Sequence, residues 1–98
     1  MAKPRCIACG GRAAHRHHVV YEQAIEREGG DTRDDRNLVW VCFDCHGAHH
    51  GRSRPLELAV LPDSCYEFAG ELLGLAGFDY LRRRYAGDDP RLVALLSV

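Results

Sequence analysis

The chain has 98 residues, 46% of them hydrophobic, and a formal net charge of −1. This length predicts one small domain that a bound metal could stabilise, and the hydrophobic content excludes a disordered chain. No stretch approaches the ~20 apolar residues of a membrane-spanning helix. Residues 1–10 also lack the apolar segment of a secretory signal, so we expect a cytoplasmic protein without a membrane partner.

The cysteines form two Cys-x-x-Cys pairs and one single residue. Cys6 and Cys9 make the first pair, Cys42 and Cys45 the second, and Cys65 stands apart. In a reducing compartment, two such pairs about 30 residues apart are typical of a zinc ion held by four thiolates. A redox dithiol would need one pair beside a β-α-β pattern, which is not visible. We therefore predict a structural Zn²⁺ site.

Two strands and two short helices are predicted around the cysteine pairs. Residues 13–21 contain β-branched residues typical of a strand, and residues 21–30 contain helix formers that stop at two glycines. Residues 37–41 predict a second strand, which leads directly into a helix over residues 42–51. The first half of the chain is therefore expected to combine a small sheet with helices.

The second half of the chain predicts helices. Residues 63–74 have apolar side chains at helical spacing, and residues 78–87 and 89–96 continue this pattern. Residues 55–64 are largely apolar but fit a strand and a helix equally well. We expect a helical hairpin that covers the strands and the zinc site.

Three apolar side chains near these features are expected to be buried. Cys65 lies on the apolar stripe of a predicted helix and should pack as a small hydrophobic residue. Trp40 precedes the second cysteine pair and Phe43 lies within it, and we expect both in the core rather than stacked on nucleic acid bases.

All six histidines fall into two clusters, at residues 15–18 and residues 46–50. His46 and His50 are four residues apart and would share one face of a helix, although His49 also neighbours His46 and is an alternative ligand. One helical histidine is more often packed or solvated than bound to a metal. A divalent ion held by two of these and one strand imidazole would keep positions open for water and substrate, as catalytic metal sites do.

The order and spacing of these residues resemble an HNH endonuclease of the ββα-metal fold, in its variety with paired zinc knuckles. The resemblance lies in His17-His18-Val19-Val20, Asn37-Leu38-Val39 and Cys42-x-x-Cys45-His46-x-x-x-His50, and it covers about residues 6–51. It implies a small α+β protein with an HNH core at residues 1–54 and a C-terminal helical extension at residues 55–98 that packs on it. The chain is also similar to HNH proteins of bacteriophages. That similarity implies the cytoplasm of a bacterium or of a phage-infected cell, with phage packaging or recombination proteins as partners.

The resemblance also implies a role for each matching position. His18 corresponds to the general base that deprotonates water, and Asn37 to the asparagine that pins the loop between the strands and so orients the base. His17, His46 and His50 correspond to the ligands of a catalytic Mg²⁺, Mn²⁺, Ni²⁺ or Zn²⁺ ion. The paired cysteines correspond to the structural zinc site. A neutral imidazole is a competent base near neutral pH, which agrees with the role of His18.

The first histidine cluster raises a geometric question. Strict strand alternation would point His17 and His18 to opposite faces, so both can serve one site only if the strand bends or ends there. His15 shares a strand face with His17, and we expect it to be exposed rather than in contact with phosphate.

We expect a metal-dependent endonuclease that cleaves double-stranded DNA. Arg16, Arg52 and Arg54 would contact phosphates, which positions the protein without reading sequence. The run at residues 82–84 is a second basic patch, although such runs are usually solvated helix faces. A non-enzymatic zinc-ribbon-like module that binds nucleic acid or protein is the alternative, and it explains the cysteines but not the histidines. A toxin or homing-type nuclease would share the chemistry, and the sequence does not separate that role.

Overall fold

Within residues 3–96, which the computed structural model of the protein describes, the chain forms a two-stranded antiparallel sheet and five α-helices. The elements are β1 (His15–His18), α1 (Glu22–Arg27), β2 (Leu38–Val41), α2 (Phe43–His50), α3 (Asp63–Leu73), α4 (Leu75–Arg84) and α5 (Pro90–Leu96). Short 3₁₀ turns occur at Asp35–Asn37 and Leu58–Val60. The protein is therefore a small α+β structure, as predicted.

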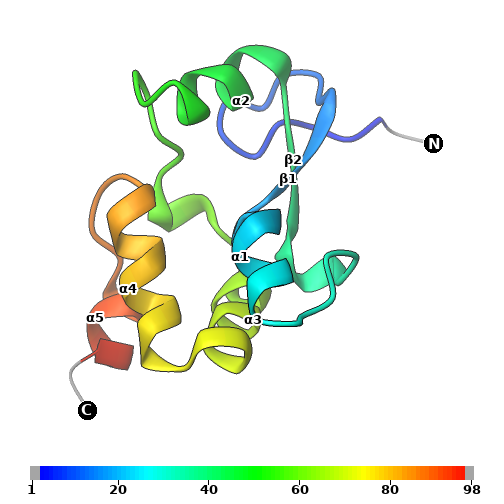
Figure 1. Ribbon diagram of the computed structural model, residues 1–98. Coiled ribbons are helices and arrows are strands. Elements are labelled where there is room, and N and C mark those ends of the chain that lie inside the picture. The colour runs from blue at the N-terminus through cyan, green and yellow to red at the C-terminus, as the bar shows by residue number, and fades with distance from the viewer. Residues whose placement is uncertain (1–2, 97–98) are drawn as a thin grey trace.

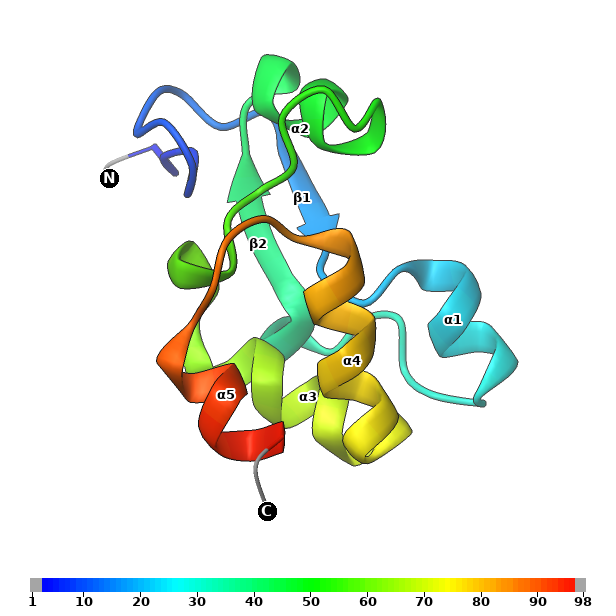
Figure 2. The ribbon, with the colours of Figure 1, turned by 90° about the vertical axis from the view of Figure 1, so that its left-hand side faces the viewer.

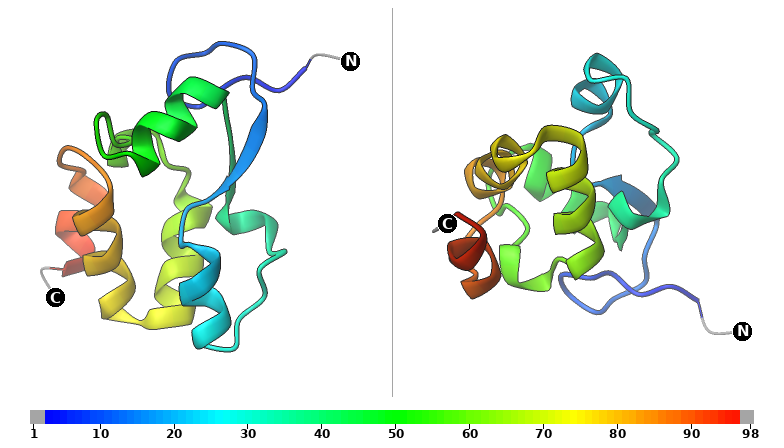
Figure 3. Two further views of the ribbon diagram at one scale, coloured as in Figure 1. Left: turned by 45° about the horizontal axis from the view of Figure 1, so that its top comes forward. Right: turned by 90° about the horizontal axis from the view of Figure 1, so that it is seen from below.

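Helices lie at both ends of the strand pair. Helix α2 follows β2 directly and covers one end, whereas α3 and α5 lie at the opposite end (Figure 1; Figure 2). Strand β1 runs away from α2 and leads into α1 (Figure 3). The order strand, strand, helix that the ββα-metal pattern requires is thus present in β1, β2 and α2.

The register of the two strands decides which side chains face inward. His17 pairs with Val39 and His18 with Leu38. In β2, Val39 and Val41 are buried, and Trp40 between them is 39% exposed, because successive strand residues point to opposite faces. Phe43, in the first turn of α2, is 72% exposed. The prediction that Trp40 and Phe43 belong to the core is therefore wrong.

The hydrophobic core draws side chains from both halves of the chain. Its fully buried members include Val19, Val20, Ile25, Val41, Leu58, Leu61, Cys65, Ala69 and Leu81. Cys65 is buried as predicted. The predicted division of the chain at residue 54 remains a prediction.

Close helix packing in the second half depends on a glycine. A Cβ atom at Gly77 of α4 would overlap the backbone of Ala69 in α3, so only glycine permits this approach. The apolar stretch that fitted a strand and a helix equally well forms an extended segment and the 3₁₀ turn at Leu58–Val60. Leu56, Leu58 and Leu61 of this stretch are buried in the core. Among the described residues, no helix is both long and apolar enough to cross a membrane.

Candidate functional site

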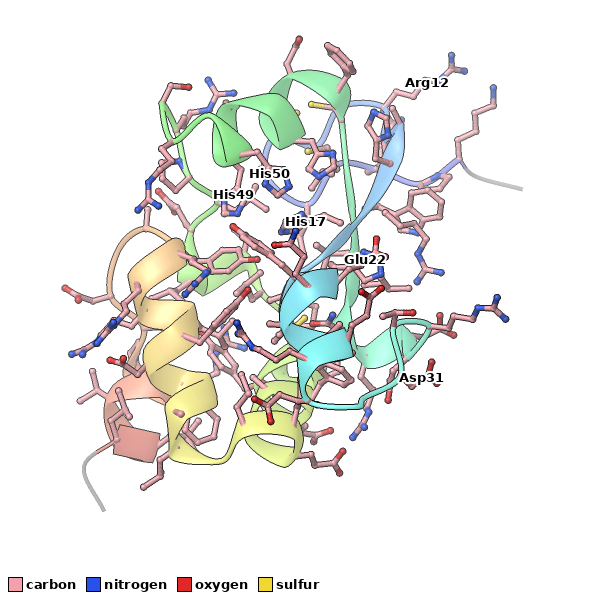
Figure 4. All side chains as sticks on the ribbon, in the orientation of Figure 1. Arg12, His17, Glu22, Asp31, His49 and His50 are labelled. Atoms are coloured by element: carbon pink, nitrogen blue, oxygen red, sulfur yellow. The ribbon has the colours of Figure 1, made fainter. Side chains whose placement is uncertain are left out.

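Three histidines from β1 and α2 converge on one point. His17, His46 and His50 each offer a ring nitrogen, and these nitrogens lie within 4.8 Å of one another. The Nε2 atoms of His46 and His50 are 3.1 Å apart, because residues four apart share a helix face. Figure 4 shows His17 and His50 between the strand and α2. The structure therefore brings together the three residues that the sequence pattern predicts as ligands of a divalent ion.

The surroundings of His17 and His46 favour their neutral imidazole forms. Burial, followed by the charges of His49, His46, His50 and His18, lowers the pKa of His17 to about 2. Burial, followed by His50 and His15, also lowers the pKa of His46. A neutral imidazole keeps a lone pair that a cation can accept, so the donor set fits a divalent ion.

An open hollow of about 360 Å³ lies over the three histidines. Arg16, His18, Tyr21, Glu22 and Gln23 line it together with the cluster. His18 is only partly buried, and its Nε2 is 2.9 Å from the backbone carbonyl of Thr32. A carbonyl only accepts, so Nε2 carries the hydrogen and Nδ1 keeps the lone pair. This Nδ1 lies 3.6 Å from a carboxylate oxygen of Glu22.

The chain bends immediately after His18, and both histidines of the pair line the same hollow. β1 ends at His18, and the next two residues hydrogen-bond to Asn37. The backbone N–H of Val19 donates to the Asn37 carbonyl at 2.9 Å. The Asn37 side chain accepts from Val20 N–H at 2.7 Å and donates to the Val20 carbonyl at 2.9 Å. The strand therefore ends at the second histidine of the pair.

His49 lies beside the cluster, but both its ring nitrogens are engaged within the protein. The backbone N–H of Leu56 donates to Nδ1 at 2.9 Å, so the ring hydrogen is on Nε2, which donates to the Tyr21 hydroxyl at 2.8 Å. The residue is 2% exposed. Burial, followed by the charges of His50, His46 and Arg52, lowers its pKa to about 4. Its contacts are those of a structural residue, which leaves His50 as the second nitrogen donor from α2.

Two tyrosines beside the histidines were not predicted as part of the site. Tyr85 hydrogen-bonds to Nε2 of His17 at 2.8 Å, and its ring stacks on His49 at a centroid distance of 4.7 Å. Tyr21 bonds to His49 and lines the hollow. Tyr85 falls in the stretch of helical apolar spacing at residues 78–87, but nothing local in the sequence links it to a histidine 68 residues away.

The four paired cysteines form a second cluster. Their four sulfur atoms all lie within 4.8 Å of one another, and they belong to Cys6, Cys9, Cys42 and Cys45. Backbone N–H groups point at the sulfurs, from Gly11 to Cys9 at 3.4 Å and from Cys45 to Cys42 at 3.3 Å. Four thiols this close can lose their protons together only if a cation balances the charge. The donor set fits a four-coordinate structural zinc ion.

The arginines predicted to contact nucleic acid lie in different surroundings. Arg16 lines the hollow. Its guanidinium lies over the Trp40 ring and pairs with Asp35 at 3.3 Å, and neither of these two partners lines the hollow. Arg52 is exposed just after α2, with a positive φ of 62°. Arg54 lies 3.7 Å from the sulfur of Cys45, beside the cysteine cluster rather than the histidines.

The basic run at residues 82–84 and His15 do not line the hollow. Arg82 and Arg83 of the basic run both pair with Asp79, whereas Arg84 lies 3.7 Å above the Tyr80 ring. His15 is exposed, as expected.

Comparison with known proteins identifies the first half of the chain. No curated protein and no solved structure gives a significant match. The family model of HNH endonucleases matches residues 6–52, a range that contains both cysteine pairs, both histidine clusters and Asn37. The resemblance stated from the sequence is confirmed. Residues 6–52, just under half of the chain, therefore match the HNH endonuclease family.

Proposed function

We propose that this protein is a metal-dependent endonuclease that hydrolyses phosphodiester bonds in DNA. His18 acts as the general base, and His17, His46 and His50 hold the divalent ion. One observation carries the proposal: the three converging histidines open into the same hollow that His18 lines. The match of residues 6–52 to the HNH endonuclease family supports a nucleic acid substrate.

Phosphodiester hydrolysis needs a deprotonated water, neutralised charge at phosphorus and a stabilised leaving oxygen. A bound divalent ion supplies the last two. The protein itself must bind the phosphate, orient the base and remove a proton. Each of these tasks can be assigned to residues at the hollow.

His18 removes the proton from the attacking water. Its Nε2–H donates to the carbonyl of Thr32, so Nδ1 is the atom that accepts the proton. The carboxylate of Glu22, 3.6 Å from Nδ1, stabilises the imidazolium that results. The hollow is open, so this proton can pass to solvent afterwards.

Positioning falls to Asn37 and the nearby arginines. The two hydrogen bonds between Asn37 and Val20 fix the bend that presents His18 to the hollow. Arg16 lines the hollow, and its exposed pair with Asp35 is weak enough to be exchanged for a phosphate. Arg52 and Arg54 are exposed around the end of α2 and would contact phosphates farther along the backbone.

The test is relaxation of a supercoiled plasmid by the zinc-loaded protein, with Mg²⁺, Mn²⁺, Ni²⁺ or additional Zn²⁺. We expect His18→Ala to lower the rate by at least about 100-fold, the range for loss of a general base. Glu26→Ala is the control, because Glu26 is exposed on α1 and does not line the hollow. Structural zinc content and the urea unfolding midpoint should be unchanged in both variants.

Two outcomes would overturn the proposal. Cleavage by His18→Ala at the wild-type rate would remove His18 as the base. Absence of cleavage with all four ions, with DNA binding retained, would instead support a non-enzymatic zinc module. The preference for double-stranded DNA, the cytoplasmic location and the partners in phage packaging or recombination remain predictions from the resemblance.

A further inference from the structure

We infer that Tyr85, directly after α4, is a positioning residue of the histidine metal centre: its hydroxyl fixes His17 in the tautomer whose Nδ1 binds the ion. The inference rests on the proposed function, because it concerns the same three histidines. It assigns a task at that centre to the C-terminal half of the chain, which lies outside the matched HNH segment.

The first step concerns the single hydrogen of the phenol. The Tyr85 hydroxyl donates to the backbone carbonyl of Val19 at 2.5 Å. Its oxygen is also 2.8 Å from Nε2 of His17. Because the only hydroxyl hydrogen is used on Val19, the oxygen must accept from His17, and Nε2 must carry a hydrogen. The remaining lone pair of the neutral ring is therefore on Nδ1.

The second step concerns how firmly this arrangement is held. Tyr85 is 4% exposed and His17 is 2% exposed, so water does not compete readily for either group. The Tyr85 ring stacks on His49, with an interplanar angle of 27°. His49 is in turn fixed by hydrogen bonds to Tyr21 and to the backbone of Leu56. The hydroxyl is thus placed by a packed ring rather than by a mobile side chain.

The third step links the metal ligand to the general base. Val19 follows His18 directly, and its carbonyl is held by Tyr85 while its N–H is held by the Asn37 backbone. Tyr85 therefore holds both the ring of His17 and the bend that turns His18 into the hollow. Partners that orient metal-binding histidines in this way typically change metal affinity by 10- to 100-fold when removed.

The test compares Tyr85→Phe with Tyr66→Phe in full-length, zinc-loaded protein. Each substitution removes one hydroxyl from a buried tyrosine, but Tyr66 hydrogen-bonds to Asp89 and Leu58, away from the histidines. Long-range ¹H–¹⁵N spectra at pH 8 report the histidine tautomers without any catalytic ion. Calorimetric titration with Ni²⁺ reports affinity at the histidine site, with His50→Ala identifying which binding event belongs to it.

We expect wild-type His17 to carry its hydrogen on Nε2, and Tyr85→Phe to mix the two tautomers and weaken Ni²⁺ binding by 10- to 100-fold. Tyr66→Phe should change neither. Wild-type His17 protonated on Nδ1 would overturn the inference without any variant, so an unfolded Tyr85→Phe does not leave it untested. Unchanged Ni²⁺ affinity in folded Tyr85→Phe would also overturn it. If wild type bound no Ni²⁺ at the histidines, the proposed metal centre itself would be overturned.

Discussion

The side-chain amide of Asn37 makes two hydrogen bonds to one backbone residue, Val20. It accepts from the Val20 N–H at 2.7 Å and donates to the Val20 carbonyl at 2.9 Å, and Asn37 is fully buried. These bonds replace the ladder bonds that Val20 would make if β1 continued. The end of the strand, and with it the placement of His17 and His18 in one hollow, depends on this contact.

Replacing Asn37 by alanine should therefore destabilise the protein by about 2–4 kcal/mol, because two buried backbone groups lose their partners. Urea unfolding followed by circular dichroism measures this change. Glu26→Ala, at an exposed position of α1, is the control and should shift the free energy of unfolding by less than about 0.5 kcal/mol. Equal midpoints for wild type and Asn37→Ala would contradict the structural role assigned to the asparagine.

His49 and His50 should respond in opposite ways to substitution. His49→Ala removes a buried ring with two hydrogen bonds and should lower the free energy of unfolding by about 2–4 kcal/mol. His50→Ala, at an exposed position, should leave stability within about 1 kcal/mol of wild type but weaken Ni²⁺ binding. Urea unfolding and calorimetry on the same preparations separate the two effects. Strong Ni²⁺ binding retained by His50→Ala would point back to His49 as the ligand.

Local spacing explains why so much of the site could be predicted. The i,i+4 pair His46 and His50 and the two Cys-x-x-Cys pairs are short-range patterns, and a helix or a tight turn brings such residues together without information from the rest of the chain. The bend after His18 is different. It was recognised as a requirement, but the contact that makes it joins Val20 to Asn37, which is 17 residues away.

Long-range packing explains what was missed. Tyr85 meets His17 across 68 residues, and a buried aromatic on a helical stripe carries no sign of which polar group its hydroxyl will reach. Trp40 was expected in the core because it is apolar, yet strand alternation turns it outward, where it packs on Arg16. Hydrophobicity alone could not decide this, since exposed apolar residues are common.

The cysteine cluster should hold one zinc ion that the fold needs. Cys9→Ser removes one of the four sulfurs and should lose the zinc together with several kcal/mol of stability, because metal binding energy is also folding energy at such sites. Cys65→Ala is the matched control, since Cys65 is a buried thiol outside the cluster. Atomic absorption and thermal unfolding measure the two quantities. Stoichiometric zinc at the thiolates of Cys9→Ser would rule out a four-cysteine site.

Arg16 should contribute to DNA binding through a phosphate contact. Arg16→Ala is expected to weaken binding of duplex DNA and to reduce the slope of log K against log salt by about 0.9, the value for one lost contact. Fluorescence anisotropy between low and moderate salt measures this slope. Arg83→Ala is the control, because Arg83 is paired with Asp79 on α4 and does not line the hollow. An identical slope for wild type and Arg16→Ala would remove Arg16 from the interface.

Stability should fall in acid partly through Asp89, which precedes α5. Its carboxylate accepts hydrogen bonds from Arg91 at 2.6 Å and from the Tyr66 hydroxyl at 2.8 Å. The Arg91 side chain, against an opposing effect of burial and with help from the Arg91 backbone and Tyr66, lowers the Asp89 pKa from 3.8 to about 2. A folded-state pKa below the unfolded value stabilises the protein above pH 3.8, and this stabilisation is lost as the pH falls toward 2.

Asp89→Asn should therefore lower stability by about 1–2 kcal/mol near neutral pH, and the difference from wild type should shrink as the pH falls below about 4. Urea unfolding of both proteins from pH 7 to pH 2 measures it, and loss of zinc in acid affects both proteins alike. Asp88→Asn, at an exposed neighbouring position, should show no such pH-dependent difference. A constant gap between wild type and Asp89→Asn across this range would show that the ionised carboxylate is not what holds α5 in place.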